Sequence, residues 1–272
     1  MKKSLQDALI DEHFRSAAAQ LLFQLADDDF ILSYRGSEWL GLAPHIEEDV
    51  AFSSISQDTM GHAAMFYGLL EELGEGSADT LAHARPAEER KNAILLEKVN
   101  GPGTYLIEPQ YDWAFTVVRN YFYTAGKKVK IDSLKSSSYQ PLSEAAVKVN
   151  MELFYHLLHW KTWFSQLMKA GGEARKRMEK AAEEVFQELG GIFSLGEKGE
   201  IMNSLGLISG EEGLKSAWIT MMKPVFQELQ YNMPSQFLMM SGDGRNGEHT
   251  EDLQTALNTL SEVYRLDRSA SW

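Results

Sequence analysis

The chain contains no cysteine among its 272 residues. This absence excludes disulfides, zinc–thiolate sites, iron–sulfur clusters and thiol nucleophiles on this chain. No run of eighteen apolar residues occurs, and the first thirty residues hold no apolar segment typical of a secretion signal. We therefore expect a soluble, cytoplasmic protein that does not contact a membrane.

Basic residues are in the minority. The 26 Lys and Arg against 39 Asp and Glu give a formal net charge of −13. Binding to a phosphate backbone requires clustered Lys and Arg, so this balance argues against a nucleic-acid partner. The hydrophobic content of 44%, with 11% aromatic residues, is ample for a large core.

Strand-like alternation bounded by turns is also missing, whereas helical periodicity recurs along the chain. The sequence therefore predicts an all-α fold with one domain over residues 1–272. In it a core bundle spans about residues 5–170 and extra helices span about 173–267. Four long helices are expected over residues 1–35, 47–73, 113–131 and 141–170, and three more over 173–189, 214–229 and from 250 onward. We expect a capping box at Ser209–Glu212 and a kink or division at Pro224.

Two histidines lie on the most apolar stripes of two predicted long helices. His62 shares a face with Phe52, Ile55, Phe66 and Leu69 at alternating three- and four-residue steps. His156 lies on an equivalent stripe, which includes Leu142, Ala146, Val149, Leu153, Trp160, Trp163 and Leu167. This spacing places both histidines toward the core. The pattern suggests a ferritin-like four-helix bundle.

The residue three positions before each histidine is the important departure from the metal-binding members of that fold. A di-iron bundle uses Glu-x-x-His on two helices, but here Thr59 precedes His62 and Leu153 precedes His156. The third long helix has no acidic residue between Trp113 and Ile131. We therefore predict no catalytic residue, metal or cofactor on this chain. Asp29, Thr59, His62, Leu153 and His156 would be the vestigial positions of a lost site.

Two aspartates interrupt the apolar stripe of the first helix. Asp28 and Asp29 are expected at a partly wet edge, because burial of either would require a partner. His62 and His156 are predicted to approach each other in the core, with one of these aspartates nearby. An alternative is an independent oxidoreductase with one metal held by Asp29, His62 and His156, since two histidines and a carboxylate form a recognised iron site.

Several short segments together resemble one known family. They are Arg35–Trp39, Ala43-Pro44, Gln57–His62, Phe154–Leu157 and the loop Gly244-x-x-Gly247-x-His249-Thr250-Glu251. In the order and spacing of these segments, the chain is similar to the PaaA/PaaC family of phenylacetic acid catabolic proteins, and within it to the companion subunits of the phenylacetyl-CoA ring epoxidase, the PaaC type. The resemblance covers roughly Leu22 to Trp272.

The resemblance implies a role in aerobic phenylacetate degradation. The PaaA-type subunits of the family carry Asp-Glu-x-Gly-His, where this chain has Asp58-Thr59-Met60-Gly61-His62. A ferritin-like, non-catalytic subunit of a multicomponent monooxygenase is therefore implied. It would pair with the PaaA-type catalytic subunit as a hetero-oligomer and could form a homodimer when alone. The di-iron would lie on that partner, which epoxidises the aromatic ring of phenylacetyl-CoA.

A partner subunit needs an exposed apolar surface. The candidate stretches are Met221–Phe237 and Trp113–Tyr123, which are rich in aromatic residues and methionine. A third hypothesis is a stand-alone binding protein, with a pocket in place of the metals.

Overall fold

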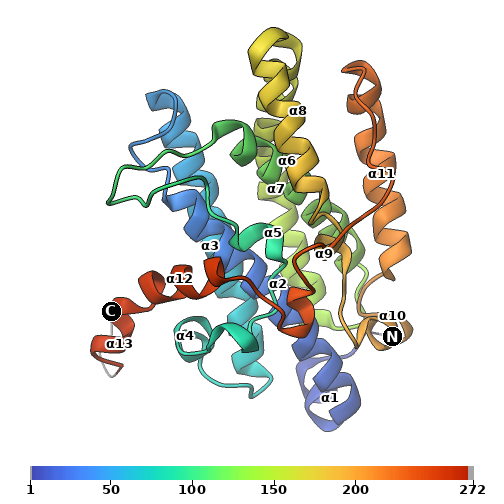
Figure 1. Ribbon diagram of the computed structural model, residues 1–272. Coiled ribbons are helices and arrows are strands. Elements are labelled where there is room, and N and C mark those ends of the chain that lie inside the picture. The colour runs from blue at the N-terminus through green and yellow to red at the C-terminus, as the bar shows by residue number, and fades with distance from the viewer. Residues whose placement is uncertain (1, 269–272) are drawn as a thin grey trace. The chain divides into compact units, whose positions relative to one another are not determined.

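The computed structural model describes residues 2–268, and these residues form an all-α protein (Figure 1). They contain no β-strand beyond two isolated bridges, Lys3 with Tyr139 and Thr104 with Ile107. The chain divides into two compact units. The first contains Asn100–Ser241 with the N-terminal residues up to Ser4, and the second contains Leu5–Val99 with the segment from Gly242 onward. The predicted single domain is not tested by this division and stays a prediction.

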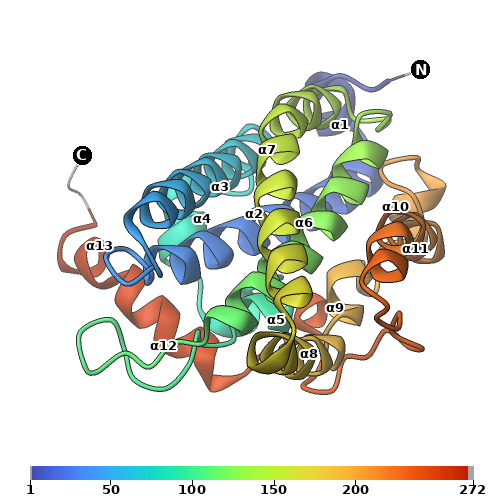
Figure 2. The same cartoon turned by 90° about the horizontal axis from the view of Figure 1, so that it is seen from above.

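The second unit is built on two long helices, α2 and α3, which lie side by side (Figures 1 and 2). The expected single helix over residues 1–35 is wrong, because the chain breaks at Asp11. The Asp11 side chain accepts a hydrogen bond from the Phe14 amide at 3.1 Å, which caps the N-terminus of α2. The elements are α1 Leu5–Ile10, α2 Glu12–Ser37, α3 Ile46–Glu72, α4 Ala78–His83, η1 Ala87–Glu89, α5 Ile94–Glu97, η2 Gly244–Asn246, α12 Glu251–Leu260 and α13 Glu262–Leu266.

Close approach of α2 and α3 depends on Gly36. A β-carbon at this position would overlap the Ser56 side chain and lie 3.1 Å from the Phe52 ring. Ser56 cannot easily turn away, because its hydroxyl donates to the Phe52 carbonyl at 2.8 Å. The absence of a side chain at residue 36 therefore sets how closely the two helices pack.

The first unit is built on α6 and α7, which also lie side by side and are covered by α8 (Figure 2). Its core is aromatic. The Phe122 ring contacts Trp218 edge-on and stacks on Phe186, and the Trp218 indole donates to the Phe122 carbonyl at 3.1 Å. The elements are α6 Trp113–Leu134, α7 Gln140–Ala170, α8 Gly172–Phe186, α9 Gly190–Phe193, α10 Gly199–Ser204 and α11 Glu211–Glu228.

Two local predictions in this unit are wrong, and a third is wrong in part. Helix α8 ends at Phe186, before the glycines at 190 and 191, where α9 begins. The capping box does not form, because Gly210 is the N-cap of α11 and Glu212 pairs with Lys215 at 2.9 Å. Pro224 does not divide α11, and the alternative of a kink there stays a prediction. Pro224 lies on the exposed face, where water can satisfy the carbonyl that it leaves unpaired.

None of the helices in residues 2–268 is both long and apolar enough to cross a bilayer.

Candidate functional site

His62 lies on the buried face of α3, as the periodicity predicts. Its neighbours on that face, Phe52 and Phe66, are buried as well. Thr59, one turn earlier, directs its hydroxyl to the Ile55 carbonyl of its own helix at 2.7 Å. That bond is an ordinary intrahelical contact of threonine. Asp58 is half-buried and lies off the His62 face, as its position in the helix predicts.

His156 lies on the buried face of α7 in the other unit. Leu153, one turn before it, is buried and apolar, and Trp160 is buried one turn after it. Glu152 is exposed. The two histidines thus belong to different units. The predicted approach of His62 to His156 stays a prediction.

The aspartates of α2 are buried, so the expected wet edge is wrong. Asp28 and Asp29 are each only 1% exposed, and the preceding Asp27 is buried too. Asp28 has the partner that burial requires. The two terminal nitrogens of Arg245 lie 2.7 and 2.8 Å from its two carboxylate oxygens, a bidentate ion pair. Asp28 also accepts from the Ala93 amide at 2.8 Å.

Asp27 is the centre of a second buried cluster. Its carboxylate pairs with Arg85 and Arg90, accepts from the Tyr67 hydroxyl at 2.5 Å, and accepts from the Lys91 amide at 2.8 Å. Burial alone would raise the pKa of Asp27, but the two guanidinium groups outweigh burial and hold the pKa below its ordinary value of 3.8. Burial, together with the adjacent Asp27 carboxylate, raises the pKa of Tyr67 far above its ordinary range, so Tyr67 is a neutral hydrogen-bond donor.

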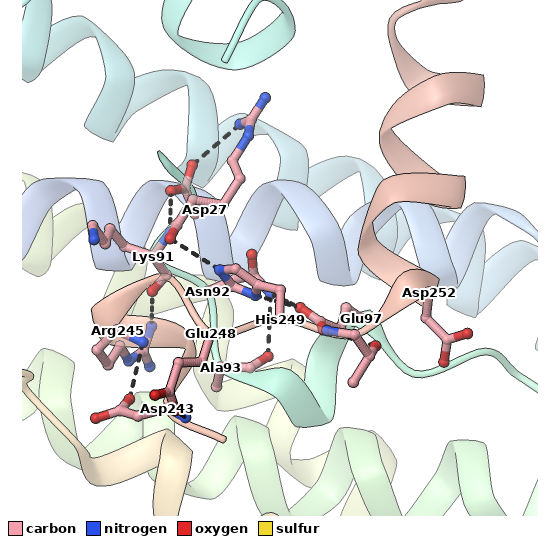
Figure 3. A network of polar contacts seen from close by, with 12 residues as sticks. Asp27, Lys91, Asn92, Ala93, Glu97, Asp243, Arg245, Glu248, His249 and Asp252 are labelled. Atoms are coloured by element: carbon pink, nitrogen blue, oxygen red, sulfur yellow. Dashed lines mark hydrogen bonds and ion pairs between the residues drawn. The ribbon is translucent and has the colours of Figure 1, made fainter. Parts of the chain in front are cut away.

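A third cluster joins Glu97 of α5 to the C-terminal segment (Figure 3). His249 Nδ1 is 2.8 Å from a Glu97 carboxylate oxygen, and its Nε2 is 3.0 Å from the Arg90 carbonyl. The other Glu97 carboxylate oxygen accepts from both the amide and the hydroxyl of Thr250, at 2.7 and 2.9 Å. Thr250 therefore uses its hydroxyl on Glu97 and does not cap α12 with it. The Glu97 backbone carbonyl accepts from the buried Arg35 at 2.7 Å.

The Asp28 and Glu97 clusters fasten the loop after Gly242 to α2, to α5 and to the segment before α5, whereas the Asp27 cluster fastens the segment between α4 and α5 to α2 and α3. The pairing of Arg245 with Asp28 was not predicted from the sequence. Figure 3 shows Arg245 beside Lys91, whose carbonyl it binds at 2.6 Å. Buried charges that are all paired or hydrogen-bonded hold a fold in one arrangement.

Comparison with known proteins identifies the family. The family model described as "Phenylacetic acid catabolic protein" (PaaA_PaaC) matches residues 1–272. The chain belongs to this family. The family is ferritin-like, and together with the all-helical structure this confirms the predicted fold class.

One curated relative extends the comparison. The chain is 28% identical over 250 residues to a component of the 1,2-phenylacetyl-CoA epoxidase of Escherichia coli (strain K12), the subunit designated C. The alignment covers 92% of this chain and 96% of the relative. The resemblance drawn from the short segments is therefore confirmed.

The residues present do not fit a carboxylate-bridged di-iron centre. Such a centre needs a carboxylate three residues before each histidine. Here Leu153 has no donor atom, and Thr59 offers only a hydroxyl that already serves its own helix. Within each unit, no three His, Asp or Glu side chains of residues 2–268 are grouped so that they could hold a metal ion. The predicted lack of a metal stays a prediction.

Proposed function

We propose that this protein is a structural, non-catalytic subunit of a phenylacetyl-CoA epoxidase. It would pair with a di-iron catalytic subunit of the PaaA type in phenylacetate degradation. The match to the family over the whole chain supports this role. The likeness to a relative that is named as a subunit of such an epoxidase supports it as well.

One observation carries the proposal. The helix that presents His62 and the helix that presents His156 are both formed, with the histidines buried, but the residue one turn before each is not a carboxylate. A bundle that keeps its histidines and lacks its bridging ligands can retain its shape without the redox chemistry of the site.

A second feature supports a structural role. Several buried acidic and basic groups of the second unit hold the chain together, as the pairs Asp27–Arg90, Asp28–Arg245 and Glu97–His249 illustrate. The alternative of an independent oxidoreductase would need Asp29, His62 and His156 to hold one metal.

Co-expression tests the proposal. The chain, tagged, is produced with a PaaA-type catalytic subunit and purified, and phenylacetyl-CoA turnover is measured with the reductase of the system. We expect a complex that copurifies and is active, with turnover unchanged when this chain carries His62→Gln and His156→Gln. Glutamine keeps a hydrogen-bonding group of a size similar to that of histidine. Circular dichroism checks separately that the variant is folded.

Two results would contradict the proposal. Separate migration of the two chains at micromolar concentration, together with full activity of the catalytic chain alone, would remove the partner role. Loss of turnover in a folded His62→Gln, His156→Gln complex would show that these histidines take part in the chemistry.

A further inference from the structure

The buried side chain of His249 has a hydrogen-bond acceptor beside each of its two ring nitrogens. Nδ1 lies 2.8 Å from a carboxylate oxygen of Glu97 (Figure 3). Nε2 lies 3.0 Å from the backbone carbonyl oxygen of Arg90. The side chains of His249 and Glu97 are 4% and 0% exposed, so water cannot replace either contact. The hydrogen atoms of the ring must therefore satisfy both acceptors.

These acceptors determine how many protons the pair holds. A carbonyl oxygen can only accept a hydrogen bond, so Nε2 of His249 carries a hydrogen. Nδ1 faces a carboxyl group, so a second hydrogen lies between this nitrogen and Glu97. Whichever of the two atoms it is bonded to, the pair holds one proton more than a neutral histidine and an ionised glutamate hold together.

The other hydrogen bonds to Glu97 favour the charged form of the pair. The side-chain amide of Asn92 donates at 2.8 Å to the carboxylate oxygen that His249 contacts. The second carboxylate oxygen accepts from the backbone amide and the hydroxyl of Thr250 at 2.7 and 2.9 Å. Each oxygen therefore faces two donors, which is how an ionised carboxylate is satisfied. His249 is accordingly an imidazolium cation in this arrangement.

The C-terminal segment, described as far as residue 268 and beginning at Gly242, thus has two cationic anchors. Arg245 pairs with Asp28, and His249 pairs with Glu97. A guanidinium group keeps its proton in proteins, whereas histidine is the side chain that gains or loses a proton near neutral pH. The anchor at Asp28 is therefore insensitive to pH in that range, and the anchor at Glu97 is sensitive to it.

We propose that the proton held between Glu97 and His249 fastens the C-terminal segment, and that the segment detaches more readily when this proton is lost. A histidine in water is mostly neutral above about pH 6.5, so the attached segment holds one proton more than the detached segment there. Rising pH therefore favours detachment. The equilibrium constant for detachment should rise by up to about ten-fold for each pH unit. Detachment uncovers Leu253 and Leu257, which α12 buries.

Other charged groups lie on the elements around this pair. Arginine, lysine, aspartate and glutamate keep their charges near neutral pH, so these groups do not change the direction of the effect. They are Asp28 and Arg35 of α2, Arg90 and Lys91 before α5, Asp243, Arg245 and Glu248 of the loop, and Asp252 of α12.

One further histidine touches the C-terminal segment. The ring of His83 in α4 stacks on Tyr264 of α13, with 5.3 Å between the ring centroids. Burial, with the Arg90 guanidinium nearby, lowers the pKa of His83 below its ordinary value of 6.5. His83 is therefore neutral above that pH whether the segment is attached or detached, and it adds nothing to the change expected there.

Nitrogen-15 NMR of the full-length protein with labelled histidines reads the proton directly. The variant His249→Gln assigns the signal among the seven histidines. At neutral pH both ring nitrogens of His249 should carry a proton in the native protein. Glu97→Gln removes the negative charge and should leave one ring nitrogen without a proton. A bare ring nitrogen on His249 in the native protein at neutral pH would overturn the proposal.

Hydrogen exchange followed by mass spectrometry measures the attachment itself. The quantity compared is the protection factor, which is the exchange rate of a free amide divided by the measured rate. This ratio removes the rise of the free-amide rate with pH. Residues 253–260 of α12 should lose up to about ten-fold in protection for each pH unit above neutral, whereas the interior of α3 should not. His249→Gln should lower the protection of α12 at neutral pH and leave less than about two-fold dependence on pH.

His45→Gln is the matched control. His45 lies 3.2 Å from Glu47, but the two side chains are 49% and 81% exposed. An exposed pair contributes little to stability. This variant should therefore keep the native dependence of α12 protection on pH.

The hydrogen-exchange experiment can overturn the proposal in three ways. Protection of α12 in the native protein could be independent of pH, the dependence could persist in His249→Gln, or α3 could lose protection together with α12. The NMR measurement uses the native protein, so it tests the proton even where a variant does not fold. No readout involves a partner subunit or turnover, so this inference can fail while the proposed function stands, and the reverse.

Discussion

Helices α2 and α7 depart from the usual distribution of polar and apolar residues in opposite ways. Helix α2 buries three consecutive aspartates, Asp27, Asp28 and Asp29. Helix α7 exposes a seam of large apolar side chains over residues 147–158. Charged groups are rarely buried without a partner, and continuous apolar edges are rarely left in water. Each helix therefore raises the question of what covers the misplaced groups.

The partners of these groups differ between the two helices. The partners of Asp27 and Asp28 are in the same chain, in the segment around residues 85–93 and in the loop that carries Arg245. For the seam of α7, no described part of its own unit provides a cover. The lesson is that unusual groups with a partner in the chain indicate internal structure, whereas those without one indicate association.

The largest expected loss of stability comes from breaking the ion pair between Asp28 of α2 and Arg245. Arg245→Met should leave the carboxylate of Asp28 buried without its countercharge, and should lower the free energy of unfolding by about 3–5 kcal/mol. Chemical denaturation followed by circular dichroism measures it. Arg177→Met removes an exposed pair with Glu173 and should change stability by no more than about 0.5 kcal/mol. Equal losses in the two variants would contradict the account of the buried pair.

Low pH should lower the stability of the protein through Asp27, which lies on the same helix. Its pKa is lower folded than unfolded, so near and below pH 3.8 the unfolded chain binds more protons and stability falls as pH falls. The contribution is fully present at neutral pH. Asp27→Asn should remove this component and flatten the fall of the unfolding free energy below pH 4. An identical dependence of the unfolding free energy on pH in the native protein and in Asp27→Asn would contradict this role of Asp27.

Tight packing of α2 against α3 gives a smaller effect. Gly36→Ala forces the new methyl against Ser56 and should cost about 1–3 kcal/mol. Gly61, within α3, has open space around the position of a β-carbon. Gly61→Ala should therefore stabilise the protein by about 0.5–1 kcal/mol, because alanine favours helix. Thermal unfolding compares the two, and a gain from both would show that the helices are not in close contact at Gly36.

On α7 the expected effect on folding is close to zero. Met151→Gln replaces an exposed side chain and should change the free energy of unfolding by less than about 0.5 kcal/mol when measured on the diluted, monomeric protein. A loss of several kcal/mol in the monomer would show that the seam belongs to the core.

Much of the fold could be predicted from the sequence, because local periodicity and local caps determine it. The start of α3 was expected near Glu47 and is at Ile46, and α6 begins at Trp113 as expected. The buried positions of His62 and His156 follow from the same periodicity. These features depend on residues within a few turns of one another.

The errors arose where distant residues decide the outcome. Asp28 was expected near water because its partner, Arg245, lies 217 residues away in the chain. Thr250 directly precedes α12, yet its hydroxyl donates to Glu97 and does not cap that helix. Spacing along one helix contains no information about such partners. The grouping of Gly244, Gly247 and His249 in the motif of the C-terminal loop was the available signal that the loop is fixed in place.

The central claim is that this chain holds the shape of a di-iron subunit without its metal. The most direct test is the iron content of the chain purified alone after expression in iron-rich medium, with its optical and Mössbauer spectra. The account predicts well under one iron per chain and no oxygenase activity, because Thr59 and Leu153 occupy the positions of the carboxylate ligands. Two irons per chain with the spectrum of a bridged pair would contradict it.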